Sequence, residues 1–406
     1  MKIEEQALSA INLWESSCLT EKAKRVLDFA KKQRNLASGV ITIPDGNKCA
    51  AAEYGFQLYC NAAEIAADDS INQETYQIIA LLMTMEAIRT DSWSYGAKLL
   101  YDLRNSGIKL TREEISAFLA QEGTFATNPR KASLMDANTA AIAICCANMA
   151  TLYGSLRGRC VLFQSAPDSS LMAQVESCWS KPGAEGSAPV ACSNMEIIEK
   201  LLNTYALAYL GAEQEANLIG FIKFLRSSGN KSKSESEGFY SAPTKETGPG
   251  AYTGGLAEHT VSMFCWLISL VKPQDAGQVG ELVMAAVGHG LCHVNAFVRN
   301  TWEQEKVYCD DGNLQEPDGR KFKLQSKETF IRKDKMPFGY GRKSLYILTS
   351  YFGASIKENL AAAIDGYLHD PSENSNIAYQ MMEYPLCVYL AMAEIAVSHH
   401  DEIIGR

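Results

Sequence analysis

Two segments of the chain decide its fold: Gly254-Gly-Leu-Ala-Glu-His259 and Ala285-Ala-Val-Gly-His289-Gly-Leu-Cys-His293. Both run from small residues into apolar residues at helical spacing, and both carry histidine. In and just before the second segment, four residues at helical offsets fall on one face: Leu282, Ala286, His289 and His293. We therefore expect two histidine-bearing helices, over residues 256–271 and 278–294.

Helical periodicity also runs through the first half of the chain. Apolar residues return every three or four positions over residues 3–29 and again over residues 78–103. Thr111-Arg-Glu-Glu114 has the capping-box pattern that begins a helix. Residues 137–156 are rich in alanine, which is typical of a helix that packs closely on several sides.

Fewer segments favour β-structure. Residues 306–308 and 321–324 alternate loosely around glycines and predict a hairpin, and two short strands are predicted at 161–164 and 188–191. The remaining predicted elements are helices: 194–226, capped by Ser193, then 343–351, 355–368 and 385–403, the last with Pro385 in a first turn that tolerates proline.

Residues 227–238 break the helical pattern. The segment is polar and has no large apolar side chain, which is typical of a linker or exposed loop. A chain of 406 residues is long enough for two domains. We therefore predict a mainly α protein with a helical N-terminal domain at 1–226, the linker at 227–238, and an all-α domain with a small β-hairpin insertion at 239–406. The sequence assigns no role to the first domain.

Composition and charge narrow the classes of function. The formal net charge is −9, so the chain has no general attraction for nucleic acid or anionic membranes. It has no run of about 18 uncharged apolar residues, so no membrane-spanning helix is expected. None of its twelve cysteines forms a C-x-x-C pair. We therefore expect buried, reduced thiols, a cytoplasmic location and no cysteine-based zinc site.

The chain from Gly238 to Glu402 resembles the HD superfamily of metal-dependent phosphohydrolases. The framework segments of that family occur here in family order: Phe239-Tyr-Ser-Ala-Pro243, Gly254 to His259, Ala285 to His293, Pro337-Phe-Gly-Tyr-Gly-Arg-Lys-Ser344 and Glu383-Tyr-Pro-Leu386. The resemblance implies an HD-type all-α fold in which histidines and carboxylates on facing helices hold divalent metal, which activates water for phosphoester hydrolysis. It also implies a bacterial or phage cytosolic setting.

The family's metal ligands are matched only in part. The resemblance places the first two family histidines at His259 and His289. The aspartate of the His-Asp pair falls on Gly290, which has no side chain to donate, and the closing aspartate falls on Glu394. The family's phosphate-contacting lysine falls on His293.

Four further family histidines are replaced by other residues: Pro249, Tyr340, Tyr367 and Ala391. Replacement at so many positions within an intact framework indicates a fold retained after its chemistry was lost. We therefore predict an HD-like domain that is catalytically inactive, with no catalytic residue and no cofactor. It would bind a phosphate-containing or nucleotide ligand, or a protein partner.

The alternative is an active phosphohydrolase with a rearranged metal site. His289 and His293 are four residues apart on one helical face, a spacing that lets both imidazoles reach one ion. With His259 and Glu394 they would hold zinc, manganese or magnesium. The competing interpretation makes His259 a hydrogen-bonded remnant beneath the former pocket and His293 a polar residue near a helix end.

A second candidate site is the basic segment 320–343, which has nine Lys/Arg and two acids. If it binds phosphate, the residues that border the family's site are Tyr340, Arg342 and Lys343. The competing interpretation is a solvated hairpin whose lysines aid solubility. No aromatic interleaving typical of single-strand binding accompanies the charges, so nucleic acid is not expected as a partner.

Two interpretations are left for the remaining segments. The dipeptides His369-Asp370 and His400-Asp401 lie near predicted helix ends, and we expect them to be solvated and not catalytic. A third hypothesis for the whole chain is a structural protein whose N-terminal helices bind a protein partner.

Overall fold

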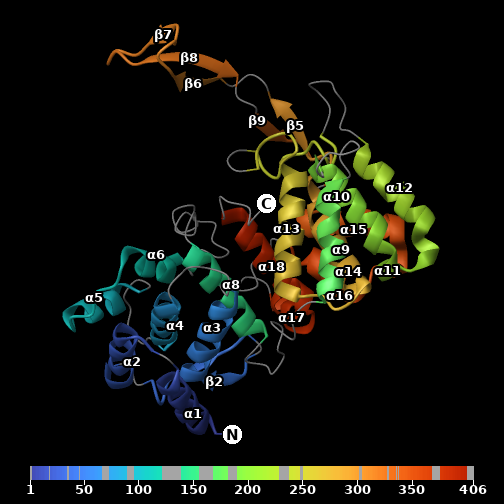
Figure 1. The fold of residues 1–406 in the computed structure, drawn as a ribbon. Coiled ribbons are helices and arrows are strands. Elements are labelled where there is room, and N and C mark those ends of the chain that lie inside the picture. The colour runs from blue at the N-terminus through green and yellow to red at the C-terminus, as the bar shows by residue number, and fades with distance from the viewer. Residues whose placement is uncertain are drawn as a thin grey trace. The chain divides into compact units, whose positions relative to one another are not determined.

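The chain is mainly α-helical with small β-sheets, as the sequence predicts (Figure 1). The computed structural model describes residues 2–17, 19–33, 36–44, 46–65, 73–88, 96–120, 139–154, 168–181, 190–227, 237–246, 250–300, 304–326, 329–334, 336, 338–367 and 375–399. Several predicted features lie outside these residues: the strand at 161–164, Pro249, most of the linker, and both His-Asp dipeptides.

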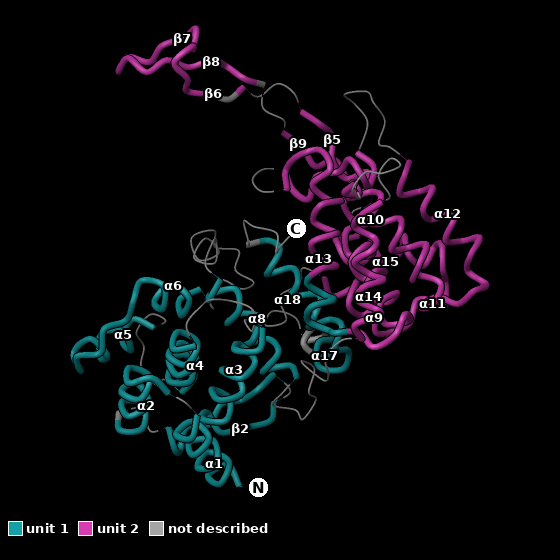
Figure 2. Tube along the Cα trace, in the orientation of Figure 1, with its two compact units in different colours: residues 1–166, 266–272, 368–406 teal, residues 167–265, 273–367 magenta. Residues whose placement is uncertain are grey.

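The described residues divide into two compact units (Figure 2). Unit 1 comprises residues 1–166, 266–272 and 368–406, and unit 2 comprises 167–265 and 273–367. The predicted linker does not separate them, because unit 2 includes residues on both sides of it. α12 (Glu215–Arg226), before the linker, and α14 (Ala276–Gly290), farther along the chain, both pack on α15 (Tyr340–Phe352).

Unit 1 consists of helices and a short hairpin. Its elements are α1 (Ile3–Ser16), α2 (Glu21–Gln33), β1 (Val40–Thr42), β2 (Lys48–Ala50), α3 (Ala51–Ile65), α4 (Gln73–Ala87), α5 (Ala97–Asn105), α6 (Arg112–Ala120), α8 (Thr139–Tyr153), α17 (Ser375–Glu383) and α18 (Pro385–His399). The strands pair antiparallel, with Ile41 opposite Cys49. α3 packs on α1, α4 and α8, and α18 also packs on α8.

α8 is buried on nearly all sides, as its alanine-rich sequence predicts. Its polar residues are buried with partners, because an unpaired polar group in a core is costly. Tyr54 donates its hydroxyl to Asn148 Oδ1 at 2.8 Å, and Asn61 Nδ2 donates to Thr151 Oγ1 at 2.8 Å. These two hydrogen bonds fix the register of α3 against α8.

The other helices predicted in unit 1 form with interruptions. The repeat over residues 3–29 is divided into α1 and α2, and the Thr20 hydroxyl accepts the Ala23 N–H at 3.2 Å where α2 begins. The repeat over 78–103 is divided between α4 and α5. The predicted capping box is confirmed: the Thr111 N–H donates to Glu114 Oε2 at 2.7 Å, and the Glu114 N–H donates to Thr111 Oγ1 at 3.1 Å.

Unit 2 is a helical body with short strands. Besides α12, α14 and α15 its elements are α9 (Ser169–Glu176), η3 (Ser177–Trp179), β3 (Ser180–Lys181), β4 (Val190–Ala191), α10 (Asn194–Leu201), the π-helical turn η4 (Leu202–Ala206), α11 (Leu207–Leu210), η5 (Ala212–Gln214), α13 (Gly255–Val271, whose last residues group with unit 1), η6 (Leu291–His293), β5 (Phe297–Asn300), β6 (Gln304–Tyr308), β7 (Leu314–Gln315), β8 (Lys321–Ser326), β9 (Thr329–Arg332), η7 (Gly353–Ser355) and α16 (Glu358–Asp365).

The single helix predicted over 194–226 is wrong in its second half. Its start is confirmed, because Ser193 Oγ accepts the Glu196 N–H at 3.3 Å and caps α10. The helix continues through η4 and α11 and stops at Gly211, whose φ of 103° suits glycine and few other residues. α12 is therefore a separate helix.

The two predicted histidine helices are confirmed as α13 and α14, although α14 tightens into the 3₁₀ turn η6 after Gly290. The predicted stripe on α14 is buried throughout, with no member more than 5% exposed: Leu282, Ala286, His289 and His293. Gly288 permits close packing, since a Cβ there would lie 2.8 Å from Leu348 Cδ1 and 3.0 Å from Ile364 Cδ1.

The predicted hairpin is confirmed as β6 and β8, which pair antiparallel with Lys306 opposite Leu324 and Tyr308 opposite Phe322. β7 adds a third strand, and β5 pairs with β9 in a separate two-stranded sheet. Within the described ranges, no helix has the length and apolar character needed to cross a membrane. No disulfide joins the described cysteines, most of which are buried.

Candidate functional site

Two histidines of unit 2 face each other, one from α13 and one from α14. The ring centroids of His259 and His289 are 5.3 Å apart, and an imidazole nitrogen of one lies within 4.8 Å of an imidazole nitrogen of the other. His289 is fully buried and His259 is partly exposed. Two imidazoles at this spacing can ligate one ion after small adjustments, because Zn–N bonds are about 2.0–2.1 Å long.

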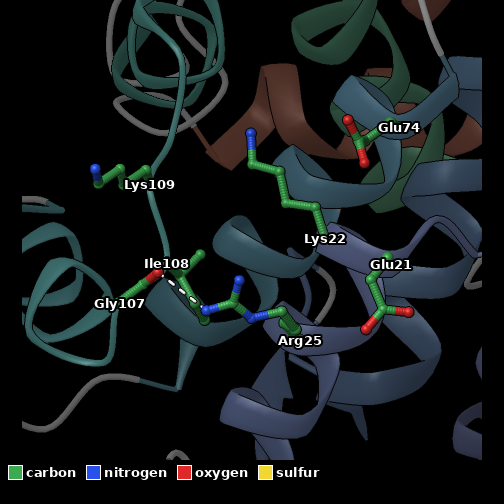
Figure 3. A pocket seen from close by; sticks show the side chains of 7 residues that line it. All are labelled: Glu21, Lys22, Arg25, Glu74, Gly107, Ile108 and Lys109. Atoms are coloured by element: carbon green, nitrogen blue, oxygen red, sulfur yellow. Dashed lines mark hydrogen bonds between the residues drawn. The ribbon is translucent and has the colours of Figure 1, made fainter.

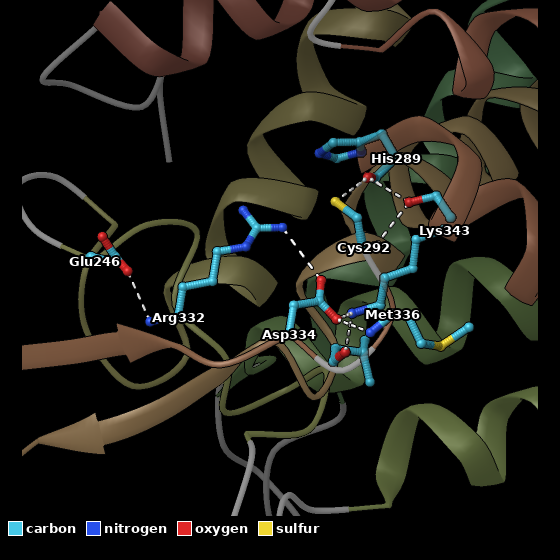
Figure 4. A network of polar contacts seen from close by, with 9 residues as sticks. Glu246, His289, Cys292, Arg332, Asp334, Met336 and Lys343 are labelled. Atoms are coloured by element: carbon cyan, nitrogen blue, oxygen red, sulfur yellow. Dashed lines mark hydrogen bonds and ion pairs between the residues drawn. The ribbon is translucent and has the colours of Figure 1, made fainter. Parts of the chain in front are cut away.

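The backbone of His289 is fixed by α15 (Figure 4). Ser344 Oγ donates to the His289 carbonyl at 3.1 Å and accepts the Cys292 N–H at 2.9 Å. The His289 ring meets Tyr367 edge to face, with centroids 5.0 Å apart. Tyr367, at a position where the resemblance expects histidine, therefore packs an aromatic ring against His289.

His293 lies one helical turn beyond His289 but makes different contacts. Its ring stacks on Phe297 with centroids 5.7 Å apart and planes 11° from parallel, and it lies 5.8 Å from the ring of Tyr340. Among the described residues, the grouping of imidazole nitrogens around His259 and His289 does not include His293. The 3₁₀ turn η6 accounts for this difference. The α-helix ends at Gly290, so His293 does not follow the α-helical spacing that would place its side chain directly above His289.

The space beside Gly290 is filled. A Cβ at this position would lie 2.8 Å from Leu256 Cδ1 and 3.7 Å from Phe239 Cε2, and both of those side chains are fully buried. An aspartate here would have to displace a packed leucine and place its carboxylate among apolar groups. The structure therefore has no ligand at this position, and a side chain there would require Leu256 to repack.

Lys343 is the most buried cation of the predicted ligand-binding residues, at 2% exposure. Its ammonium donates to the Val294 carbonyl at 2.9 Å and to Asp334 Oδ1 at 3.0 Å (Figure 4). Burial alone would raise the pKa of Asp334, but the Met336 N–H and the charges of Lys343 and Arg332 hold that pKa below its ordinary value. Lys343 is therefore already neutralised by a carboxylate.

Arg332 covers Tyr340, the first residue of the predicted ligand trio. Its guanidinium carbon lies 4.2 Å from the centroid of the Tyr340 ring, and one guanidinium nitrogen lies 3.4 Å from Asp334. The backbone N–H of Arg332 donates to Glu246 Oε1 at 2.8 Å. Arg332 thus makes a cation–π contact with its guanidinium beside Asp334 and its backbone held by Glu246.

Arg342 points away from this network. Its side chain is 78% exposed, and its guanidinium lies 3.9 Å from Asp365. Tyr340, Arg342 and Lys343 are thus all on the first turn of α15, yet their side chains are half-buried, exposed and buried in turn. They do not converge on one point.

The basic segment 320–343 is less basic in three dimensions than in the sequence. Five of its cations are ion-paired with carboxylates: Arg320, Lys323, Arg332, Arg342 and Lys343. Three of the acids are outside the segment: Asp311, Asp318 and Asp365. The charge that this segment offers to an anion is therefore smaller than its nine basic residues indicate.

Glu394, the predicted carboxylate ligand, is on α18 in unit 1. It is partly exposed and accepts a hydrogen bond from Ser398 Oγ at 2.6 Å. α18 is held within unit 1 by its packing on α8, where Cys146 Sγ donates to the Met392 carbonyl at 3.4 Å. Its role as a ligand stays a prediction.

Unit 1 also contains a pocket that the sequence does not predict (Figure 3). The pocket has a volume of about 420 Å³ and is lined by Glu21, Lys22, Arg25, Glu74, Gly107, Ile108 and Lys109. The first turns of α2, the start of α4 and the segment after α5 supply these residues. No short motif joins them, so only the fold reveals the pocket.

Comparisons with protein-family models, with curated proteins and with solved structures found no match. The likeness to the HD superfamily therefore stays a hypothesis drawn from the residues.

Proposed function

We propose that residues 239–406 form a non-catalytic, HD-like binding domain. The observation that carries the proposal is the packing around Gly290, where the buried Leu256 side chain would have to shift to admit a metal-binding aspartate. A second ligand position of the resemblance, Tyr367, supplies an aromatic ring in place of a nitrogen donor. A hydrolase of this class needs metal to activate water, and these replacements remove donors without adding new ones.

The proposed ligand is a phosphate-containing small molecule, with nucleotides as the first class to test. Of the three predicted contact residues, Arg342 is the one that presents most of its side chain to solvent. Lys343 serves the fold, because a ligand would have to displace Asp334 to reach it. Binding would therefore depend on Arg342 more than on Lys343.

Thermal shift of the full chain with ATP, GTP, their monophosphates and inorganic phosphate tests this proposal. A ligand at about 100 times its dissociation constant stabilises the folded state by about 2.7 kcal/mol. Arg342→Gln should reduce the shift. Arg320→Gln is the matched control, because Arg320 is also an exposed, acid-paired arginine but lies in the hairpin and not on α15.

The proposal of a phosphate ligand fails if none of these compounds moves the midpoint, or if both arginine variants lose the shift equally. A stable oligomer in light scattering, together with no shift, would support the third hypothesis of a protein partner.

A second candidate function, a metal-dependent hydrolase, is favoured by one observation, the approach of His259 to His289. Two imidazoles suit zinc better than magnesium, which prefers oxygen ligands. The residues fit a metal in part, since two nitrogen donors converge while Gly290 supplies none. A bound zinc would supply a water that ionises near neutral pH.

Metal analysis of protein purified without a histidine tag decides between the two functions. If the second function is right, zinc should be stoichiometric and should be lost in His259→Ala and His289→Ala. His293→Ala is the matched control, because His293 is buried on the next turn but stacks on Phe297 instead. Glu394→Gln tests the fourth predicted ligand. Absence of stoichiometric metal, or equal loss in His293→Ala, contradicts this candidate.

A further inference from the structure

The pocket of unit 1 has charges of both signs on its wall. Its volume of about 420 Å³ is within the range that small-molecule sites occupy. Three cations line it, Lys22, Arg25 and Lys109, together with the carboxylates of Glu21 and Glu74. The pocket and every residue that lines it belong to unit 1, so it is independent of the histidine pair.

The three cations differ in what already binds them. Lys22 is neutralised by Glu114, whose two carboxylate oxygens each lie 2.7 Å from the Lys22 ammonium and whose side chain is 2% exposed. Arg25 and Lys109 are exposed, and among the described residues neither forms an ion pair. Lys22 therefore has a structural role in the ion pair with Glu114, while Arg25 and Lys109 are available to bind an anionic group.

Arg25 is positioned for such a role. One of its terminal nitrogens donates to the Gly107 carbonyl at 3.0 Å, which holds the Arg25 side chain against the segment after α5 (Figure 3). A guanidinium has five N–H donors, so this bond leaves most of them for a ligand. Because one end of the fork is already held, less conformational entropy is lost when a carboxylate binds the rest.

The carboxylates lie apart from these cations. In Figure 3, Glu21 and Glu74 are on one side of the pocket, and the Arg25 guanidinium and Lys109 are on the other. The Thr20 hydroxyl donates to Glu74, which orients that carboxylate. A ligand with a single charge would satisfy one wall and meet repulsion or desolvation at the other.

We propose that this pocket binds a small zwitterion, with its carboxylate at Arg25 and Lys109 and its ammonium group at Glu21 and Glu74. A free α-amino acid is the simplest member of this class. Each charged end then meets a group of opposite sign, and the charge-assisted hydrogen bonds to the guanidinium fix the orientation.

Calorimetric titration of the full chain tests the proposal with the common L-α-amino acids, one at a time. Acetate, inorganic phosphate and methylamine serve as probes that carry one kind of charge. We expect saturable binding of at least one amino acid, with each single-charge probe at least about tenfold weaker. Arg25→Gln should weaken that binding by at least about tenfold, as expected for loss of a charge-assisted hydrogen bond.

Lys24→Gln is the matched control, since Lys24 neighbours Arg25 on α2, is exposed and does not line the pocket. It should change the affinity by less than about twofold. Lys109→Gln is a second test that leaves all of the hydrogen bonds described above in place, and it should also weaken binding. The proposal is overturned if no amino acid binds, if phosphate alone binds as tightly, or if Lys24→Gln loses as much affinity as Arg25→Gln.

Discussion

Cationic side chains are used differently in the two units. In unit 2, Lys343 is almost fully buried and its charge is neutralised by Asp334. In unit 1, Arg25 and Lys109 are exposed beside a pocket and form no ion pair within the described residues. A buried charge must be paired, whereas an exposed charge beside a cavity remains available to bind a ligand. A cluster of charged residues in the sequence therefore indicates a ligand site only where the fold leaves those charges without ion-pair partners.

The two units also differ in how much space lies beside their candidate sites. In unit 2 the Leu256 side chain packs against Gly290, so an aspartate at this position would require Leu256 to move. In residues 1–166 of unit 1, for which the sequence shows no family resemblance, the structure leaves an open and charged cavity. The site that the sequence predicts, near Gly290, is thus more closely packed than the pocket that the sequence does not predict.

The largest effect on stability is expected from Asp334→Asn. This change leaves the Lys343 ammonium buried without its carboxylate, and breaking a buried pair in this way costs about 3–5 kcal/mol. Chemical denaturation measures the loss. Arg342→Gln, next to Lys343 on α15, should cost less than about 1 kcal/mol, because the pair of Arg342 with Asp365 is exposed. Equal losses in the two variants would remove the distinction between a buried, structural cation and an exposed one.

Gly290→Asp is expected to cost about 2–4 kcal/mol, because it forces Leu256 to move and buries a carboxylate among apolar side chains. Gly290→Ala should cost less, since only Leu256 must adjust. Unfolding curves measure both, and zinc analysis accompanies them. A stable Gly290→Asp variant that takes up metal would show that the site in unit 2 is open after all.

Lys22→Met tests the structural cation of the unit 1 pocket. Glu114 would keep its hydrogen bond to the Thr111 N–H but lose its ion pair while almost fully buried, at a cost of about 1–3 kcal/mol. Arg25→Gln should change stability by no more than about 0.5 kcal/mol, because Arg25 is exposed. Denaturation of both variants checks this order, and a reversed order would contradict the division of roles within the pocket.

The smallest effect is a pH dependence from Asp334. Its pKa is lowered in the folded protein, so its contribution to stability is present above the ordinary value of 3.8 and is lost as the pH falls through the lower folded value. The difference in thermal midpoint between the protein and Asp334→Asn should therefore narrow as the pH falls below about 4. A difference that widens in acid would mean that the carboxylate is not stabilised by Lys343 and Arg332.

Local patterns predicted much of the secondary structure. The capping box at Thr111, the cap at Ser193 and the pairing of β6 with β8 all followed from neighbouring residues. The break at Gly211 was missed, because a glycine inside an apolar repeat is tolerated in many helices and only its φ shows that it ends this one.

The candidate sites could be predicted less well. Counting charges placed a ligand at Tyr340, Arg342 and Lys343, but it did not include the acids that the fold brings to them, such as Asp365. Helical spacing placed His293 beside His289, but the turn at η6 directs its ring to Phe297. The pocket of unit 1 combines residues that are more than 80 positions apart, for which no motif exists.

By itself, the sequence determined the mainly α character and most helix starts, because periodicity and caps act over a few residues. Only the tertiary structure decided which charges are neutralised, whether Gly290 has space beside it and where a cavity opens. Those properties depend on side chains that come from distant segments, and their packing is settled when the helices meet.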